Sequence, residues 1–307
     1  MKHYTFILLL ACLILLPAVL VAQQGRVRTQ IEIINIETGE ITIVKQFDFR
    51  VEAPEFTPDG KWIYFNSGGA MYRMSSKGGE HHKINTGHLT QCINDHVISS
   101  DGTWLGITDA GTGLTGYQPK IYVLPIDGGE PRLVTRNGSS ALHGWSPDGK
   151  LLTFTGRRGN DNRDIYTITF DGETETRLTS DPCWEDGSEW APDGKYIWYN
   201  SSQSGLMQLW RMKPDGSEQT RILKEEANCW FPHASPDGKW ISYLAYKKGD
   251  VEPELHPPFK DVSIRLMSAE GGESKLLVDI FGGQGSFNVN SWAPDSKRLA
   301  YVRFDHL

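Results

Sequence analysis

The sequence has little of several features that mark other classes of protein. Its 307 residues include only four cysteines, and no run of Lys and Arg forms a basic stripe along the chain. A formal charge of −7 without such a stripe argues against nucleic acid as a partner. Beyond the N-terminus, no segment repeats apolar residues with the 3.6-residue period of a helix. These absences predict an all-β protein.

Familiar catalytic and metal-binding motifs are also missing. The chain has no Gly-x-Ser-x-Gly elbow, no Cys-x-x-Cys pair and no His-Glu-x-x-His helix. Residues 111–116 (GTGLTG) fit the letters of a dinucleotide fingerprint, but no helix follows to hold a pyrophosphate. Residues 160–164 (NDNRD) carry oxygen ligands without the spacing of a calcium loop. Motifs therefore indicate no catalytic residue, cofactor or metal.

One motif recurs six times. Pro-Asp-Gly-Lys, or a close relative, lies between two short runs of strand-forming residues, and Gly supplies the positive φ of a tight turn. The successive intervals range from 42 to 58 residues, which is typical of a repeat array. The repeated aspartates are Asp59, Asp101, Asp148, Asp193, Asp237 and Asp295.

A second hairpin follows each of the first five turns and bends near a Gly and a Glu. Two hairpins in each repeat make a four-stranded sheet, which is the blade of a β-propeller. Such a ring protects the exposed edges of its sheets by radial repetition. The predicted outer hairpins cover residues 71–84, 121–134, 165–178, 209–222 and 264–277.

The two ends of the chain complement each other. After Asp295 there is room for one strand, 298–304, but not for an outer hairpin, and the unmatched hairpin is at 31–44. We therefore predict a six-bladed β-propeller domain over 26–307, closed by pairing N-terminal and C-terminal strands in one blade. An open solenoid is the alternative, and it leaves the first hairpin unexplained.

Residues 1–22 have the pattern of an export signal peptide. Lys2 gives the positive start, residues 6–16 the apolar stretch and Ala22 the small residue for cleavage. We expect a periplasmic or secreted protein that does not span the membrane after signal removal and has no room for a second domain. Two alternatives stay open: a retained anchor, which Pro17 disfavours, and a lipoprotein cleavage box ending at Cys12.

Three cysteines would survive this processing: Cys92, Cys183 and Cys229. An odd number permits at most one internal pair. Cys183 and Cys229 lie in equivalent loops of neighbouring repeats, so they are the pair that the repeat favours. Three unpaired packing residues are the alternative.

Variation in length falls on one side of the predicted ring. The link from the Asp-Gly turn to the next outer hairpin varies, whereas the return link is nearly constant. The two longest loops are 109–120 and 246–262, the second of which contains His256. Variable loops on one face of a repeat ring usually mark the binding face.

Polar and aromatic residues precede the first strand of each repeat at that face. Most lie either seven or five residues before the repeated Asp, so they would form rings near the mouth of the channel. Carboxylate, imidazole, amide and indole groups together suit a polar ligand with some apolar surface. The predicted ligand-binding residues are Glu52, Asn94, His96, His143, Trp184, Asp186, Trp230, His256, Gln284, Asn288 and Asn290.

The tryptophans divide into two groups. Trp184 and Trp230 do not lie three residues before or after a repeated Asp, as the other group does. They are therefore either exposed contacts or partly buried under a loop. Six others recur three residues before or after the repeated Asp and are predicted to pack between blades. These six are Trp62, Trp104, Trp145, Trp190, Trp240 and Trp292.

The repeat resembles that of the TolB-like propeller family. Residues 145–150 (WSPDGK), 164–166 (DIY) and 121–130 carry the resemblance, which covers 26–307. It implies a six-bladed propeller but little about function, because the same blade occurs in peptidases and carbohydrate-active proteins. Residues 282–285 (GGQG) with 288–296 look like a subgroup signature without an assigned role.

Together these features predict a non-catalytic exported module that binds a protein or a glycan through the loop face. The alternative is a polysaccharide lyase or glycoside hydrolase that uses His96, His143, Glu52 and Asp186. His96 and His143 could also meet across blades and bind a metal, although structural histidines explain them as well. The α/β domain of TolB and the hydrolase domain of propeller peptidases are not expected, which argues against a Tol–Pal role.

Overall fold

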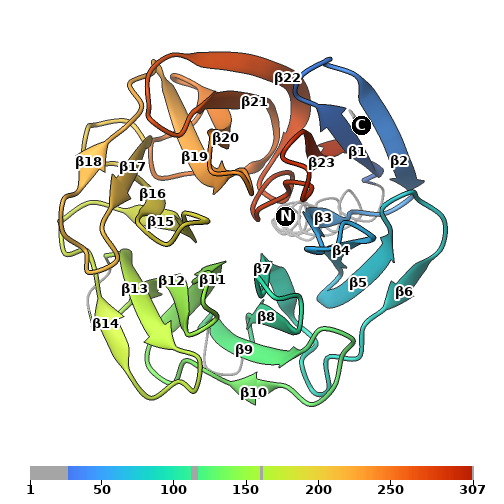
Figure 1. Cartoon of the computed structure of the whole chain (residues 1–307), viewed down its shortest axis with the longest axis horizontal. Helices are drawn as coiled ribbons and strands as arrows, with labels where there is room; N and C mark the ends of the chain where they lie inside the picture. Colours follow the sequence, from blue (N-terminus) through green and yellow to red (C-terminus); the bar gives the residue numbers. More distant parts are fainter. Residues whose placement is uncertain (1–26, 112–116, 160–161, 306–307) are drawn as a thin grey trace, which may run out of the picture.

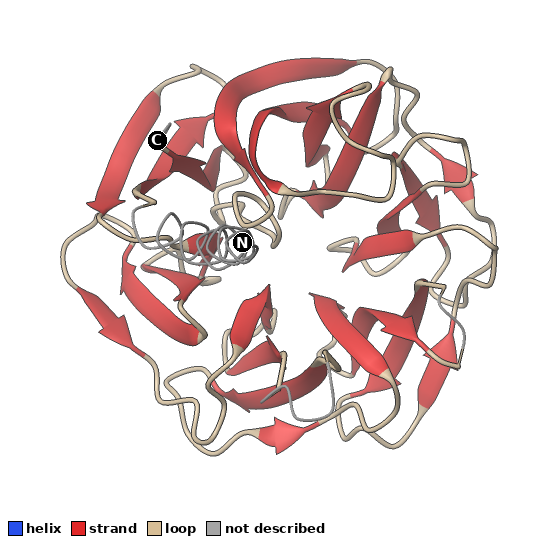
Figure 2. Cartoon of the chain, turned by 180° about the vertical axis from the view of Figure 1, so that it is seen from behind, coloured by secondary structure: helices blue, strands red, loops and turns tan. Residues whose placement is uncertain are grey.

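The computed structural model describes residues 27–111, 117–159 and 162–305. Within these ranges every regular element is a β-strand (Figure 2). The strands form six sheets around a central axis (Figure 1), which confirms the predicted all-β, six-bladed propeller. The predicted signal peptide at 1–22, residues 112–116 and residues 160–161 lie outside the described part of the chain.

Five blades contain four antiparallel strands each, ordered along the chain. The first blade comprises β3 (Glu52–Phe56), β4 (Trp62–Ser67), β5 (Ala70–Ser75) and β6 (His81–Lys83). The next comprises β7 (Cys92–Ile98), β8 (Trp104–Asp109), β9 (Lys120–Pro125) and β10 (Arg132–Leu133). The third comprises β11 (Ser139–Trp145), β12 (Leu151–Arg157), β13 (Asp164–Thr169) and β14 (Glu175–Arg177). The fourth comprises β15 (Glu185–Trp190), β16 (Ile197–Ser201), β17 (Gln208–Met212) and β18 (Thr220–Arg221). The fifth comprises β19 (Ala227–Ala234), β20 (Trp240–Lys247), β21 (Pro258–Ser268) and β22 (Ser274–Gly283).

The sixth blade joins the two ends of the described chain. Strand β1 (Thr29–Asn35) pairs with β2 (Ile41–Phe47) on one side and with β23 (Arg298–Phe304) on the other, always antiparallel. The segment before β23 takes the inner place, where the N–H of Ala293 donates to the carbonyl of Arg298 at 2.8 Å. The predicted closure of the ring by terminal strands is confirmed.

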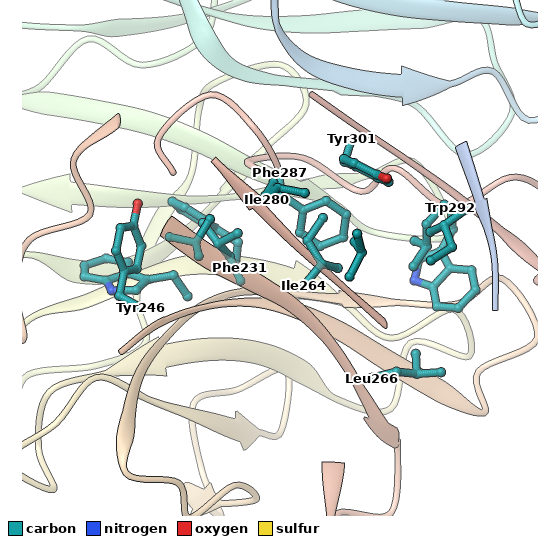
Figure 3. Close-up of a cluster of buried hydrophobic side chains, with 14 of the residues drawn as sticks. Phe231, Tyr246, Ile264, Leu266, Ile280, Phe287, Trp292 and Tyr301 are labelled. Atoms are coloured by element: carbon teal, nitrogen blue, oxygen red, sulfur yellow. The ribbon is translucent and has the colours of Figure 1, made fainter. Parts of the chain in front are cut away.

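Apolar clusters between neighbouring blades hold the ring together. The largest lies where the fifth blade meets the sixth and includes Phe287, Trp292 and Tyr301 (Figure 3). Burying such aromatic side chains removes a large apolar area from water. All six tryptophans at the recurrent positions belong to or pack against these clusters, as predicted: Trp62, Trp104, Trp145, Trp190, Trp240 and Trp292.

The inner strands of the blades contain irregular pairing that the sequence does not predict. Each of the strands β3, β7, β11, β15 and β19 contains a register shift, and four of these shifts insert a single residue. Three inserted positions share a left-handed backbone: Ala53 at φ 53°, Gly187 at 60° and Phe231 at 58°. A bulge breaks the alternation of sides along a strand. It therefore decides which side chains enter the channel.

The structure also tests three predictions about the cysteines, the second long loop and membrane-spanning helices. Cys92, Cys183 and Cys229 are all free thiols, so the candidate pair Cys183–Cys229 forms no disulfide, and the alternative of unpaired residues is confirmed. The loop expected over 246–262 is shorter, because β20 and β21 extend into it and leave residues 248–257. The ranges described contain no helix long and apolar enough to cross a membrane.

Candidate functional site

A cavity of about 1000 Å³ opens at one end of the channel. Both long loops reach it: Tyr117 and Gln118 come from the loop before β9, and His256 from the loop before β21. We name it the loop-face cavity. Seven of the eleven predicted ligand-binding residues line it: Glu52, Asn94, His143, Asp186, His256, Gln284 and Asn288.

An ion pair lies deep in this cavity. The Nε2 of His143 is 2.8 Å from Oδ1 of Asp186, and both side chains are almost completely buried. Burial disfavours the charge on His143, but Asp186 outweighs it and raises the pKa of His143 above its ordinary value.

Asp186 is held in its charged form from several sides. The Thr155 hydroxyl donates to Oδ1 at 2.7 Å, and the Gly187 N–H donates to the same atom at 2.9 Å. Arg163 donates to Oδ2 at 3.3 Å. Burial opposes ionisation, yet the contact with His143 and the nearby positive charges keep the pKa of Asp186 well below its usual range. Asp186 is therefore held as a carboxylate beside His143.

A chain of polar side chains begins at His256, whose Nε2 lies 3.9 Å from Oδ2 of Asp186. The Nδ1 of His256 contacts the side-chain oxygen of Gln284, and the amide nitrogen of Gln284 donates to Oδ1 of Asn94 at 3.1 Å. Asn94 in turn donates to Oε1 of Glu52 at 3.3 Å, where Arg50 also binds. Four separate parts of the chain thus meet in one network.

The segment 282–285 now has a structural role. Gly285 has a φ of 94°, and a Cβ atom there would lie 2.2 Å from Oε1 of Glu52. Only glycine allows the turn to approach the carboxylate so closely. The turn presents Gln284 between Asn94 and His256, so the subgroup signature builds one wall of the cavity.

Asp95 lines the cavity but is not among the predicted ligand-binding residues. It lies six residues before its repeated Asp, between the two registers considered, and the bulge in β7 brings it to the cavity wall. Burial raises the pKa of Asp95 to about 6, with His143 lowering it and Asp186 raising it. A carboxyl group in this range can hold or release a proton near neutral pH.

Trp184 lies beside the cavity rather than in its lining. The guanidinium carbons of Arg163 and Arg157 are 4.3 Å and 5.7 Å from the centre of its ring. Both arginines line the cavity. Two arginines therefore rest on one indole, and Trp184 supports the cavity wall from behind.

The remaining three predicted residues are not at the cavity. Trp230 is completely buried, with the His256 ring 4.2 Å away, so it cannot be an exposed contact. His96 is also completely buried, and burial lowers its pKa to about 3. Asn290 donates to Oε1 of Glu189 at 2.7 Å, deeper in the channel.

A second, smaller cavity opens at the other end of the channel. It has a volume of about 330 Å³ and is lined by residues of the Asp-Gly turns. We name it the turn-face cavity. His143 borders both cavities, so the ion pair with Asp186 lies between them.

The metal alternative finds no support in the residues described. His143 is paired with Asp186, whereas His96 lies 3.9 Å from Oε2 of Glu55. In ranges 27–111, 117–159 and 162–305, no three His, Cys, Asp or Glu side chains are placed to hold a metal ion.

Comparison with known proteins supplies the family. Residues 114–281 match the model of the TolB β-propeller domain. The chain belongs to the TolB-type propeller family. It is 43% identical over 281 residues to an uncharacterized protein of Agrobacterium fabrum, covering 91% of this chain and 94% of that one.

Two solved structures of this family show the same fold. A protein of Agrobacterium tumefaciens provisionally named TolB superimposes with a TM-score of 0.86 at 43% identity, over 92% of this chain and 100% of that one. TolB from Acinetobacter baumannii gives 0.62 at 19% identity, over 82% of this chain and 66% of that one. The second likeness concerns the fold alone.

Proposed function

We propose that this TolB-type propeller is an exported binding module and that its loop-face cavity binds a glycan. The depth and polarity of the cavity carry this proposal. Its volume of about 1000 Å³ is that of a small-molecule site, and amide, carboxylate and guanidinium groups line it. Sugars present many hydroxyl groups that such side chains can bind, whereas a protein partner would favour a broader and flatter surface. Export is inferred from residues 1–22 and completes the proposal.

Filling the cavity tests the proposal. Ala141 lines it, so Ala141→Trp would occupy the space of a ligand. Ser100 borders the turn-face cavity, and Ser100→Trp is the matched control at the other end of the channel. We expect the unmodified protein and Ser100→Trp to bind the same glycans on an array, and Ala141→Trp to lose them. Equal binding by all three would place the ligand elsewhere, and no binding by any would overturn the glycan proposal.

A second candidate function is cleavage of the bound glycan. It rests on Asp95, whose pKa of about 6 suits an acid or base, beside the ion pair of His143 and Asp186. His96 has no part in it, because it is buried away from the cavity. Incubation with a polysaccharide panel distinguishes the two: products that disappear in Asp95→Asn would favour the enzyme, and intact polysaccharide the binding module.

A further inference from the structure

We infer that the glycan taken by the loop-face cavity is acidic, and that Arg157 and Arg163 bind its carboxylate. This inference rests on the proposed function and adds the chemical class of the ligand. It is carried by the way the charged side chains of the cavity are paired.

The carboxylates of the two ion pairs are occupied. Glu52 binds Arg50 and the side chain of Asn94, and Asp186 binds His143, Thr155 and Arg163. Their negative charges are already matched by positive neighbours, so these two carboxylates give the cavity little attraction for a cationic ligand.

Arg157 is in the opposite situation. It lies at the end of β12, lines the cavity and is half-buried. Among the described residues, no carboxylate or carbonyl pairs with its guanidinium, whose recorded contact is the ring of Trp184. A partly buried cation without a counter-ion favours the binding of an anion.

Arg163 adds a second set of donors at the same place. One of its terminal nitrogens donates to Asp186, which leaves other N–H groups for a ligand. Both guanidiniums rest on the Trp184 ring, and stacking on an aromatic face leaves the in-plane donors of an arginine free. Trp184 is thus a positioning residue that holds two arginines toward the cavity.

The planar fork of arginine matches a carboxylate in two-point contact. The lining contains three arginines and three carboxylates, and two of these carboxylates, Glu52 and Asp186, are already paired with arginines. Uronic acid oligosaccharides combine the hydroxyl groups expected from the proposed function with this anionic group.

Calorimetric titration with paired sugars tests the inference. The probes are galacturonic acid and mannuronic acid trisaccharides, and the same sugars with their carboxyl groups reduced to alcohols. We expect at least one acid to bind about tenfold or more tightly than its reduced form, the effect of losing a charged hydrogen bond. Arg157→Gln should remove that difference and leave binding of the reduced sugar almost unchanged.

Arg211→Gln is the matched control. Arg211 also rests on aromatic rings, 4.5 Å from the centre of Tyr196, but it does not line the loop-face cavity. This variant should bind as the unmodified protein does. Trp184→Ala should weaken binding of the acid and steepen its loss with salt, whereas Trp184→Phe should restore most of it.

The outcomes separate the two proposals. Equal affinity for the acid and its reduced form, or binding of neutral glycans alone, would overturn the acidic ligand and leave glycan binding standing. Tighter binding of a sulfated neutral trisaccharide than of either uronic acid would overturn the carboxylate. If no sugar on a neutral and acidic array bound, the proposed function itself would fall.

Discussion

The two ends of the channel are built from the same repeats and yet differ in kind. The turn-face cavity is small and is bordered by prolines and tryptophans that recur from blade to blade. The loop-face cavity is three times larger and is bordered by charged and amide groups that differ in every blade. Repetition therefore supplies the packing at one end, and departures from repetition supply the chemistry at the other.

The recurrent residues show this most clearly. Five of the six repeats place a proline directly before the repeated Asp, and all five prolines border the turn-face cavity: Pro58, Pro147, Pro192, Pro236 and Pro294. At the loop end, the position seven residues before the same Asp holds two carboxylates, two amides, an alanine and a tryptophan in the six repeats. A ring of identical groups suits packing, whereas a ring of unlike groups can recognise one ligand.

The largest expected effect comes from the turn end. Trp292 is 4% exposed, and its indole N–H donates to the carbonyl of His233 at 3.1 Å. Trp292→Ala should lower the free energy of unfolding by about 3 to 5 kcal/mol, the usual result of emptying a core site. Urea unfolding followed by tryptophan fluorescence or circular dichroism measures the change.

Trp184→Ala is the counterpart at the loop end. Trp184 is only half-buried, so this variant should lose much less stability than Trp292→Ala while losing more affinity. Equal losses of stability would remove the distinction between the two ends.

An intermediate effect is expected at the turn that approaches Glu52. Gly285→Ala combines a strained backbone with a clash at the carboxylate and should cost about 2 to 3 kcal/mol of stability. Gly238 in an Asp-Gly turn has a φ of 70° and open space around its Cα. Gly238→Ala therefore carries only the backbone strain, about 1 kcal/mol. The difference in thermal unfolding midpoint between the two variants measures the cost of the clash. A similar decrease of the midpoint in both would show that the contact with Glu52 does not constrain the turn.

The smallest effect depends on pH. Burial raises the pKa of Asp95 to about 6, above the value of 3.8 that an exposed aspartate has. The folded protein therefore binds more protons than the unfolded chain between these values, and this contribution to stability is lost as pH rises through 6. Asp95→Asn should gain about 1 kcal/mol relative to the unmodified protein between pH 5 and pH 7.5. A difference that stays constant over this range in paired urea titrations would contradict the burial of a titrating carboxyl group.

Much of the fold could be predicted because the repeated motif determines local structure, namely a tight turn between two short strands. The Asp-Gly turns, the outer hairpins and the unmatched hairpin at 31–44 follow from turn chemistry and strand composition. The pairing of Thr29 with Phe304 and of Asn35 with Arg298 agrees with the closure expected from the two ends.

The candidate site was harder to predict, because bulges of one or two residues interrupt the inner strands. A regular strand would place the residues five and seven before the repeated Asp on one side. The bulges break this rule. One extra residue in β19 brings Phe231 to the cavity, and two extra residues in β7 bring Asp95 there. Trp230 is hidden for another reason: His256, from a loop 26 residues further along the chain, packs on its ring.

The pairing of β1 with β23 also determines when the ring of blades can close during synthesis of the chain. Among the described strands, β23 is the last to leave the ribosome, and until then one edge of β1 has no neighbour. The ring can therefore be completed only after all the other described strands have been synthesised. A message cut short before residue 298 yields a product whose first hairpin has no strand to pair with. Closure of the ring thus depends on the last of the described strands.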